Sequence, residues 1–296
     1  MKISKTASGV LAGCEPARFG RVGARRASLI PRESRVLKTR VLSALALAPP
    51  FLLAAYAGSP WFGFLGALGG ALMGWEWARL CHGRFGPSGW VMAVALALVG
   101  LLASEAPGAA IGLLAVAAAV IAWLDRTAGT VRAWTLTGLV YLGVTLLSLV
   151  WLRAARRLGN PVLAVWPWFG PPTSGAYAAG RTLGGPLLAP AISPRKTWSG
   201  LLGGVASAFL AGGVLLFVTG IDAPLWVLVL GPGLAVISQA GDLFESFVKR
   251  RFNVKDSSQI IPGHGGVLDR MDGLLAAAPL VALIVALLEG GVTLWQ

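Results

Sequence analysis

Acidic and basic side chains gather in one stretch, residues 249–272, of a chain whose hydrophobic body carries few charges elsewhere. The basic members of this stretch that could bind phosphate are Lys249, Arg250, Lys255 and Arg270. Asp269 and Asp272 stand three residues apart at the start of an expected helix, so their carboxylates can share one hard cation. Mg²⁺ prefers oxygen ligands and commonly bridges carboxylates to phosphates. The stretch therefore predicts a Mg²⁺-assisted phosphate site in which the basic groups neutralise a polyphosphate.

Two further features extend this site along the chain. If residues 234–250 are helical, Asp242, Ser246 and Lys249 share one helix face, which leads from a carboxylate inside the membrane to a base at its surface. The Gly-His-Gly-Gly run at 263–266 predicts a turn whose backbone amides can approach phosphate oxygens. Its His264 orients a phosphate, carries a proton or makes a hydrogen bond that stabilises the turn. A solvated loop is the alternative for such a run, but the mixed signs, the glycines and the carboxylate pair favour a site.

The elements that must position these residues are membrane helices. Of the 296 residues, 56% are hydrophobic and 12% are charged, about half the charged share of soluble domains. This composition excludes an ordinary soluble enzyme and predicts an all-α polytopic membrane protein. Apolar runs of near-spanning length predict about nine helices, at 41–58, 60–78, 88–104, 107–124, 133–152, 161–180, 198–220, 224–248 and 273–289. Ionisable groups well inside such runs are candidates for function, and they are Glu76, Asp242 and Glu245, with a headgroup boundary as the alternative for Glu76.

The distribution of basic residues predicts which side of the membrane the site faces. Residues 1–40 hold ten Lys or Arg against two Glu, and the formal net charge of the chain is +13. In a membrane protein this excess follows the positive-inside rule, so we interpret residues 1–40 as cytoplasmic and expect no nucleic-acid partner. The loops that follow the second, fourth and sixth predicted helices should lie on the same side. Their basic residues are Arg79, Arg84, Arg126, Arg132, Arg181, Arg195 and Lys196. The exceptions on the opposite side are Arg153, Arg156 and Arg157.

These patterns divide the chain into three parts. Residues 1–40 are expected to form a disordered basic arm, residues 41–160 the N-terminal transmembrane helices, and residues 161–296 the C-terminal catalytic region. The predicted polar site lies in the C-terminal third and faces the cytoplasm, and the predicted location is a bacterial inner membrane.

The stretch from Ser246 to Asp272 resembles the signature of the phosphatidate cytidylyltransferases, or CDP-diacylglycerol synthases. That signature runs Ser-x-apolar-Lys-Arg, four residues, Lys-Asp, then Pro-x-His-Gly-Gly-apolar-x-Asp-Arg-apolar-Asp, and every fixed position is filled here. Residues 175–177, 180–181 and 192–198 resemble the family's second polar region. The resemblance implies that CTP and phosphatidic acid react to CDP-diacylglycerol and pyrophosphate. It implies Mg²⁺ as cofactor, and a second cation, monovalent or divalent, is left open.

The resemblance also implies roles for the residues at matching positions. The metal ligands would be Asp242, Asp269 and Asp272. The catalytic residues would be Lys249, Arg250, His264 and Arg270. The substrate-binding residues would be Ser193, Lys196, Thr197, Ser246, Lys255, Gly265 and Gly266, with Tyr177 and Arg181 at the lipid headgroup. The implied partners are CTP, phosphatidic acid, the bilayer and a second copy of the chain in a homodimer.

One departure from the family pattern is Thr173, where family members carry an Asp two residues before Gly175. We interpret residues 155–174 as a segment read in a locally shifted frame, because a shifted reading of codons for residues 172–175 spells the family's Thr-Asp-Ile. The alternatives are an inactive paralogue or scaffold of the family, and a membrane transporter. A transporter is expected to show inverted repeats and charges in both halves, whereas the polar groups cluster here in the C-terminal third.

Overall fold

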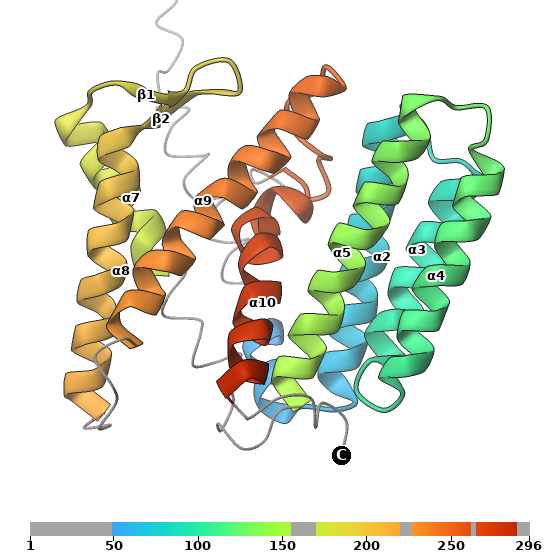
Figure 1. Ribbon diagram of the computed structural model, residues 1–296, viewed down its shortest axis with the longest axis horizontal. Coiled ribbons are helices and arrows are strands. Elements are labelled where there is room, and N and C mark those ends of the chain that lie inside the picture. Colours follow the sequence, from blue (N-terminus) through green and yellow to red (C-terminus); the bar gives the residue numbers. More distant parts are fainter. Residues whose placement is uncertain (1–48, 155–169, 220–226, 262–264, 289–296) are drawn as a thin grey trace, which may run out of the picture.

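The computed structural model describes residues 49–154, 170–219, 227–261 and 265–288, which form a row of helices with one small β-hairpin (Figure 1). The helices with full bounds are α2 (Trp61–His82), α3 (Pro87–Leu102), α4 (Pro107–Leu124), α5 (Thr130–Ala154), α7 (Gly170–Leu183), α8 (Trp198–Thr219), α9 (Val227–Arg251) and α10 (Leu268–Leu288). The antiparallel hairpin is made of β1 (Leu187–Ala189) and β2 (Ser193–Thr197). The predicted all-α class is confirmed for the membrane helices, and the small β-hairpin was not predicted.

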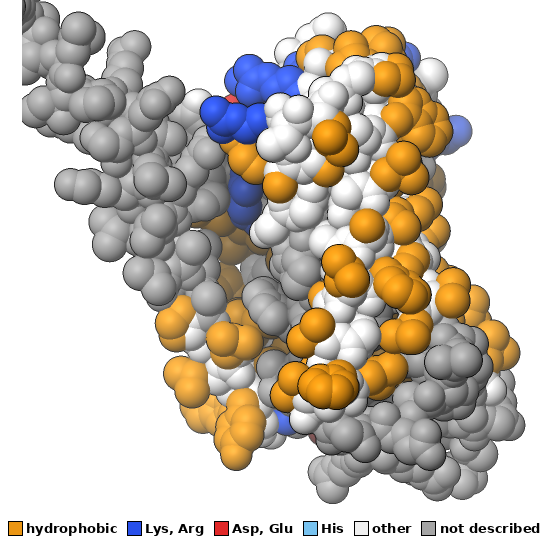
Figure 2. Space-filling model, turned by 90° about the vertical axis from the view of Figure 1, so that its left-hand side faces the viewer, with side chains coloured by type: hydrophobic (Ala, Val, Ile, Leu, Met, Phe, Trp, Pro, Cys, Tyr) orange, Lys and Arg blue, Asp and Glu red, His pale blue; other side chains and the backbone are white. Residues whose placement is uncertain are grey.

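Several of these helices present apolar surfaces that require lipid. Within the described residues, α4, α5, α8 and α10 are long and apolar enough to cross a membrane. Large apolar side chains more than 60% exposed follow α8 along its length, and they are Leu202, Leu210, Val214, Phe217 and Val218. Figure 2 shows apolar side chains spread over this side of the molecule, with Lys and Arg gathered mainly at one end. The chain is therefore a helical membrane protein.

The predicted number of about nine spans is larger than the four helices that meet this length and composition test in the described part of the chain. The run predicted at 88–104 is observed as α3, which is apolar but shorter. The runs predicted at 41–58 and 161–180 lie partly outside the described residues. The number of nine therefore stays a prediction.

The connections between helices place the basic loops at one end of the bundle. The described segments between helices at this end, the upper one in Figure 1, are 83–86, 125–129, 184–197, 252–261 and 265–267. Arg84, Arg126 and Lys196 lie within them, as the distribution of charge predicted.

Arg153, the exception to that distribution, lies at the opposite end and caps a helix. Residues 49–57 are helical, and the Arg153 guanidinium donates to the backbone carbonyls of Ala55 and Tyr56, with 2.8 Å between Nη2 and the Tyr56 oxygen. The carbonyl oxygens in the last turn of a helix receive no hydrogen bond from within the helix. A cation there also interacts favourably with the negative end of the helix dipole. The contacts of Arg153 with these carbonyls therefore explain a basic residue at this end of the bundle. Arg156 and Arg157 lie outside the described residues.

An apolar cluster ties the helices of the N-terminal half to α9 and α10. Its buried members include Met73, Trp77, Leu80, Met92, Leu96, Ile121, Leu139, Leu142, Val248, Leu268 and Leu275. Val248 lies in the last turns of α9 and Leu268 begins α10, so this core fixes the two helix ends that flank residues 252–267. On the far side α8 packs on α9, and α7 packs on α8. The pair α9 and α10 therefore lies between two groups of helices (Figure 1).

Candidate active site

A pocket of about 810 Å³ lies between the segment α7–β2–α8 on one side and the pair α9 and α10 on the other. The residues predicted from the sequence that line it are Tyr177, Arg181, Lys196, Thr197, Asp242, Asp269, Arg270 and Asp272. The two polar regions of the sequence therefore meet in one pocket. Arg181 of α7 and Arg195 and Lys196 of β2 line it on one side, and Asp242 of α9 and Asp269 and Asp272 of α10 line it on the other, with the basic Arg270 of α10 beside these carboxylates.

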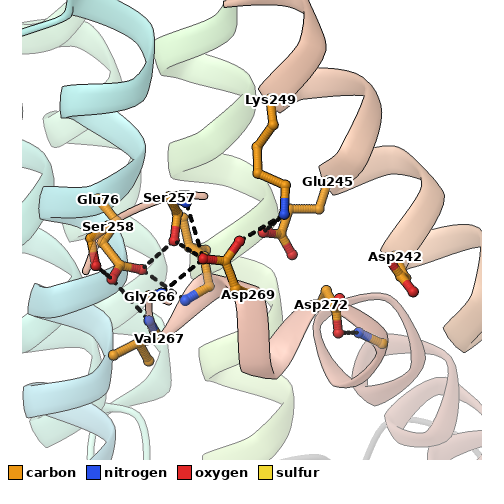
Figure 3. A network of polar contacts seen from close by, with 12 residues as sticks. Glu76, Asp242, Glu245, Lys249, Ser257, Ser258, Gly266, Val267, Asp269 and Asp272 are labelled. Atoms are coloured by element: carbon orange, nitrogen blue, oxygen red, sulfur yellow. Dashed lines mark hydrogen bonds and ion pairs between the residues drawn. The ribbon is translucent and has the colours of Figure 1, made fainter. Parts of the chain in front are cut away.

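Close packing of α9 against α10 brings Asp242 beside Asp272. A Cβ atom at Gly241 would lie 2.6 Å from the carbonyl oxygen of Asp272, so the two backbones can approach this closely only at a glycine. The carboxylates of Asp242 and Asp272 both line the pocket, and their negative charges repel each other (Figure 3). Lys196 of β2 offsets part of this repulsion, since its Nζ lies 2.5 Å from Oδ2 of Asp242.

Lys249 is held between two carboxylates. Its Nζ lies 3.0 Å from Oε1 of Glu245 and 2.7 Å from Oδ1 of Asp269 (Figure 3). Glu245 is buried, so the ammonium compensates a negative charge that has lost most of its hydration. Lys249 is not among the described residues that line the pocket. Its observed contacts join α9 to α10, and its predicted contact with a phosphate stays a prediction.

Asp269 lies in the first turn of α10 and organises the loop that precedes it. Its Oδ2 accepts hydrogen bonds from the amide of Ser257 at 3.0 Å, the hydroxyl of Ser257 at 2.9 Å and the amide of Gly266 at 2.8 Å. Its Oδ1 accepts from Lys249. Asp269 also lines the pocket, so the carboxylate connects the loop, the end of α9 and the pocket.

Glu76 of α2 holds the same loop from the other side. Its Oε1 accepts from the hydroxyl of Ser258 at 2.6 Å and the amide of Val267 at 2.8 Å. Its Oε2 accepts from the amide of Leu268 at 2.7 Å and the hydroxyl of Ser257 at 3.3 Å (Figure 3). The side chain is completely buried inside the protein, and these four contacts give it a structural role at any depth in the membrane.

The remaining predicted residues are placed less centrally. Ser193, Ser246, Arg250 and Lys255 are not among the described residues that line the pocket, and Arg250 and Lys255 are exposed. Thr197 caps α8, since its hydroxyl accepts from the amide of Gly200 at 3.1 Å.

The remaining predicted substrate-binding residues are the two glycines of the turn, Gly265 and Gly266, and the two residues expected at the lipid headgroup, Tyr177 and Arg181. Gly265 adopts a left-handed conformation with φ of 88°, and Gly266 is buried against Glu76 and Ser257. Arg181 donates to the hydroxyl of Tyr177 at 2.8 Å on the α7 side of the pocket. His264 lies outside the described residues, and so do the side chain of Thr173 and most of the segment 155–174.

Sequence reasoning missed three polar residues that line the pocket, namely Arg195, Ser238 and Gln239. Ser238 and Gln239 precede Asp242 by four and three residues, so one helix face carries all three. That spacing of polar residues inside an apolar helix was a signal that could have identified them. Ser257 and Ser258 stand inside the recognised signature, and only the folded loop reveals their contacts with carboxylates.

The carboxylates that line the pocket fit a divalent cation that a substrate helps to bind. No group of three His, Cys, Asp or Glu side chains in the described part of the chain forms a complete metal cage. Asp242 and Asp272 nevertheless present oxygen donors to the same space, and Lys196 offsets only part of their mutual repulsion. Mg²⁺ is commonly held by one or two carboxylates together with water and substrate phosphates, so this pair suits it.

Comparisons with known proteins agree with this chemistry. Residues 38–288 match the model of a family described as the cytidylyltransferase family. The phosphatidate cytidylyltransferase of Brucella suis biovar 1 is 39% identical over 262 residues, which cover 85% of this chain and 94% of that protein. The phosphatidate cytidylyltransferase of Pseudomonas aeruginosa is 34% identical over 279 residues, covering 84% of this chain and 97% of that protein.

Proposed function

The chain belongs to the cytidylyltransferase family, and from this membership we propose that it transfers the cytidylyl group of CTP to phosphatidic acid, giving CDP-diacylglycerol and pyrophosphate. The observation that carries the proposal is the pocket in which the carboxylates of α9 and α10 face the basic groups of α7 and β2. This division of charge suits a Mg²⁺ nucleotide, which itself carries both signs. A transporter or scaffold has no need of such a site.

The reaction needs charge neutralisation more than it needs a base. A phosphate oxygen of phosphatidic acid attacks the α-phosphorus of CTP, a new P–O bond forms, and the bond to the β-phosphate breaks with its electrons leaving on pyrophosphate. The nucleophile is already an anion, so the protein contributes mainly by positioning and by stabilising negative charge. The pocket supplies four cationic side chains for this purpose: Arg181, Arg195, Lys196 and Arg270.

Lys196 has a specific part in this scheme. Its ammonium now pairs with Asp242 at 2.5 Å, and a phosphate oxygen is an equivalent anionic partner. Asp242 and Asp272 would hold Mg²⁺, and Oδ1 of Asp269 keeps a lone pair available beside its bond to Lys249. When bound, the cation supplies further neutralisation of the nucleotide phosphates.

The surroundings of the pocket suit a lipid substrate. Its apolar lining includes Ala176, Leu201, Gly204 and Ala235 on helices whose outer faces require lipid. The pocket lies toward the end of the bundle that carries the basic loops. We therefore propose that the protein lies in a bacterial inner membrane with the pocket facing the cytoplasm. The proposals of about nine spans and of a homodimer rest on the apolar runs of the sequence and on the family resemblance.

The decisive experiment uses purified protein in detergent with CTP labelled in the α-phosphate, phosphatidic acid and Mg²⁺. Label should appear in a chloroform-soluble lipid with the wild type and disappear in Asp272→Asn. Glu105→Gln is the matched control, because Glu105 is an exposed carboxylate in the connection between α3 and α4. A folded wild type that makes no labelled lipid would contradict the proposal and favour an inactive paralogue. Thr173→Asp would then test whether the family's missing Asp accounts for the loss.

A further inference from the structure

The carboxylate of Glu76 links the N-terminal helices directly to the edge of the pocket. Glu76 lies on α2, and no described residue that lines the pocket comes from that helix. All four of its hydrogen-bond donors nevertheless belong to residues 257–268, the segment that leads into Asp269. A buried carboxylate that does not itself line the pocket thus holds the segment that leads into one that does.

Two of the four donors are backbone amides at the start of α10. The amides of Val267 and Leu268 precede the first hydrogen bonds of the helix and have no acceptor within it. Glu76 accepts both, at 2.8 and 2.7 Å, and its negative charge lies at the positive end of the helix dipole. The carboxylate therefore fixes the residue at which α10 begins, one position before Asp269.

Ser257 connects Glu76 to Asp269. The Ser257 hydroxyl lies 3.3 Å from Glu76 Oε2 and 2.9 Å from Asp269 Oδ2, and its one hydrogen can serve only one of the two at a time. The Ser257 amide also donates to Asp269 at 3.0 Å. Any shift of the loop away from Glu76 therefore changes the donors available to Asp269.

The backbone around this contact leaves no room for another arrangement. A Cβ atom at Gly266 would overlap the Ser257 hydroxyl and the Glu76 carboxylate. On α2 the next residue, Trp77, is buried and donates from Nε1 to the carbonyl oxygen of Trp134 on α5 at 2.9 Å. Glu76 thus extends from a rigid part of the bundle into a loop packed closely around it, as accurate positioning requires.

From these contacts we propose that Glu76 is a positioning residue for cytidylyl transfer. Its carboxylate holds Ser257, Ser258, Val267 and Leu268 in place, and this fixes the orientation in which Asp269, Arg270 and Asp272 line the pocket. The kinetic part of this inference rests on the proposed function, whereas the positioning itself rests on the four hydrogen bonds alone.

Glu76→Gln is the sharpest variant because it keeps the shape of the side chain. Each carboxylate oxygen accepts one backbone amide, from Val267 or Leu268, and a backbone amide cannot reverse its direction. Whichever way the glutamine amide turns, its NH₂ group faces one of these two donors. One buried amide at the start of α10 therefore always loses its acceptor.

The test combines hydrogen exchange with kinetics in detergent-solubilised full-length protein. In Glu76→Gln we expect exchange to rise about tenfold or more in peptides from residues 254–270, while peptides from α3 and α4 exchange as in the wild type. With CTP, phosphatidic acid and Mg²⁺, kcat should fall about 10- to 100-fold. The KM for phosphatidic acid should stay within about twofold, because the residues expected at the lipid headgroup, Tyr177 and Arg181, lie on α7 and not on the segment that Glu76 contacts.

A pair of serine variants separates positioning from simple loss of stability. Ser257 contacts both carboxylates, whereas Ser258 contacts Glu76 and the amide of Ile260. Ser257→Ala should therefore lower kcat more than Ser258→Ala does.

Three results would overturn the inference. One is unchanged exchange over 254–270 in Glu76→Gln, and another is an equal rise in exchange over α3 and α4, which would show a general loss of stability. The third is an active wild type whose kcat is unaffected by Glu76→Gln. An inactive wild type would instead contradict the proposed reaction, and the exchange measurement would still decide whether Glu76 positions the loop.

Discussion

Nζ of Lys249 lies 2.7 Å from Oδ1 of Asp269, and this ion pair joins the last turns of α9 to the first turn of α10. Glu245 completes a group of three ionisable side chains, two carboxyls and one ammonium, and most of the surface of this group is removed from solvent. Such a group is costly to break, because removing the cation leaves two carboxylates without compensation.

Replacing Lys249 with Met should therefore destabilise the protein by about 3–5 kcal/mol, the range for breaking a buried ion pair. The measurement is thermal unfolding in detergent, followed by tryptophan fluorescence. The double variant Lys249→Met/Glu245→Gln should recover part of the loss, since it removes one of the two unpaired negative charges. A double variant no more stable than the single one would show that Glu245 does not depend on Lys249.

Asp242 and Asp272 should set the requirement for Mg²⁺. In Asp242→Asn the Mg²⁺ concentration for half-maximal activity should rise at least about tenfold, because even residues that only support metal ligands change affinity by that much. Glu105→Gln serves again as the control carboxylate outside the pocket. An unchanged Mg²⁺ dependence in both Asp242→Asn and Asp272→Asn would remove this pair from the cation site.

Lys196 should contribute to nucleotide binding. Lys196→Met removes one charged contact to phosphate and should raise the KM for CTP about 10- to 100-fold, as expected for hydrogen bonds to charged groups. Arg84→Met is the matched control, because Arg84 is exposed at the same end of the bundle and does not line the pocket. Equal effects of the two variants on KM would point to general attraction by surface charge.

Gly266 should tolerate no side chain. Gly266→Ala places a methyl group against Ser257 and Glu76, so the loop must move, and activity should fall at least about tenfold. Gly112 of α4 has nothing within 4 Å of a Cβ atom, and Gly112→Ala should leave activity unchanged. Full activity in Gly266→Ala would show that the loop can rearrange without harm to the site.

The sequence pattern predicted the helices, the basic end of the bundle and the charged residues that line the pocket, because each depends on local spacing or composition. The face shared by Asp242 and Lys249 is of this kind, and α9 confirms its helical basis. What spacing could not predict is the direction each side chain takes. Asp269 and Asp272 stand one turn apart, yet Asp269 bonds the loop and Lys249, whereas Asp272 lies beside Asp242 across a glycine contact.

Long-range partners also lay beyond the sequence pattern. Glu76 meets the amide of Val267 across 191 residues, and no period or motif connects the two. A charge inside a helix of the N-terminal half identified Glu76 as unusual, but only the packing of α2 beside the start of α10 shows what it binds. Arg153 is similar, because its partners are backbone carbonyls that carry no side-chain signature.

The pairing of Lys196 with Asp242 gives the pocket the character of a zwitterion, in which an ammonium of β2 meets a carboxylate of α9. A Mg²⁺ nucleotide is also a zwitterion, so under the proposed function the carboxylates would hold the cation and the ammonium would hold a phosphate. Either ion alone would leave one protein charge without a partner in a partly dehydrated site. The pocket should therefore bind metal and nucleotide as a couple, each raising the affinity for the other by the same factor.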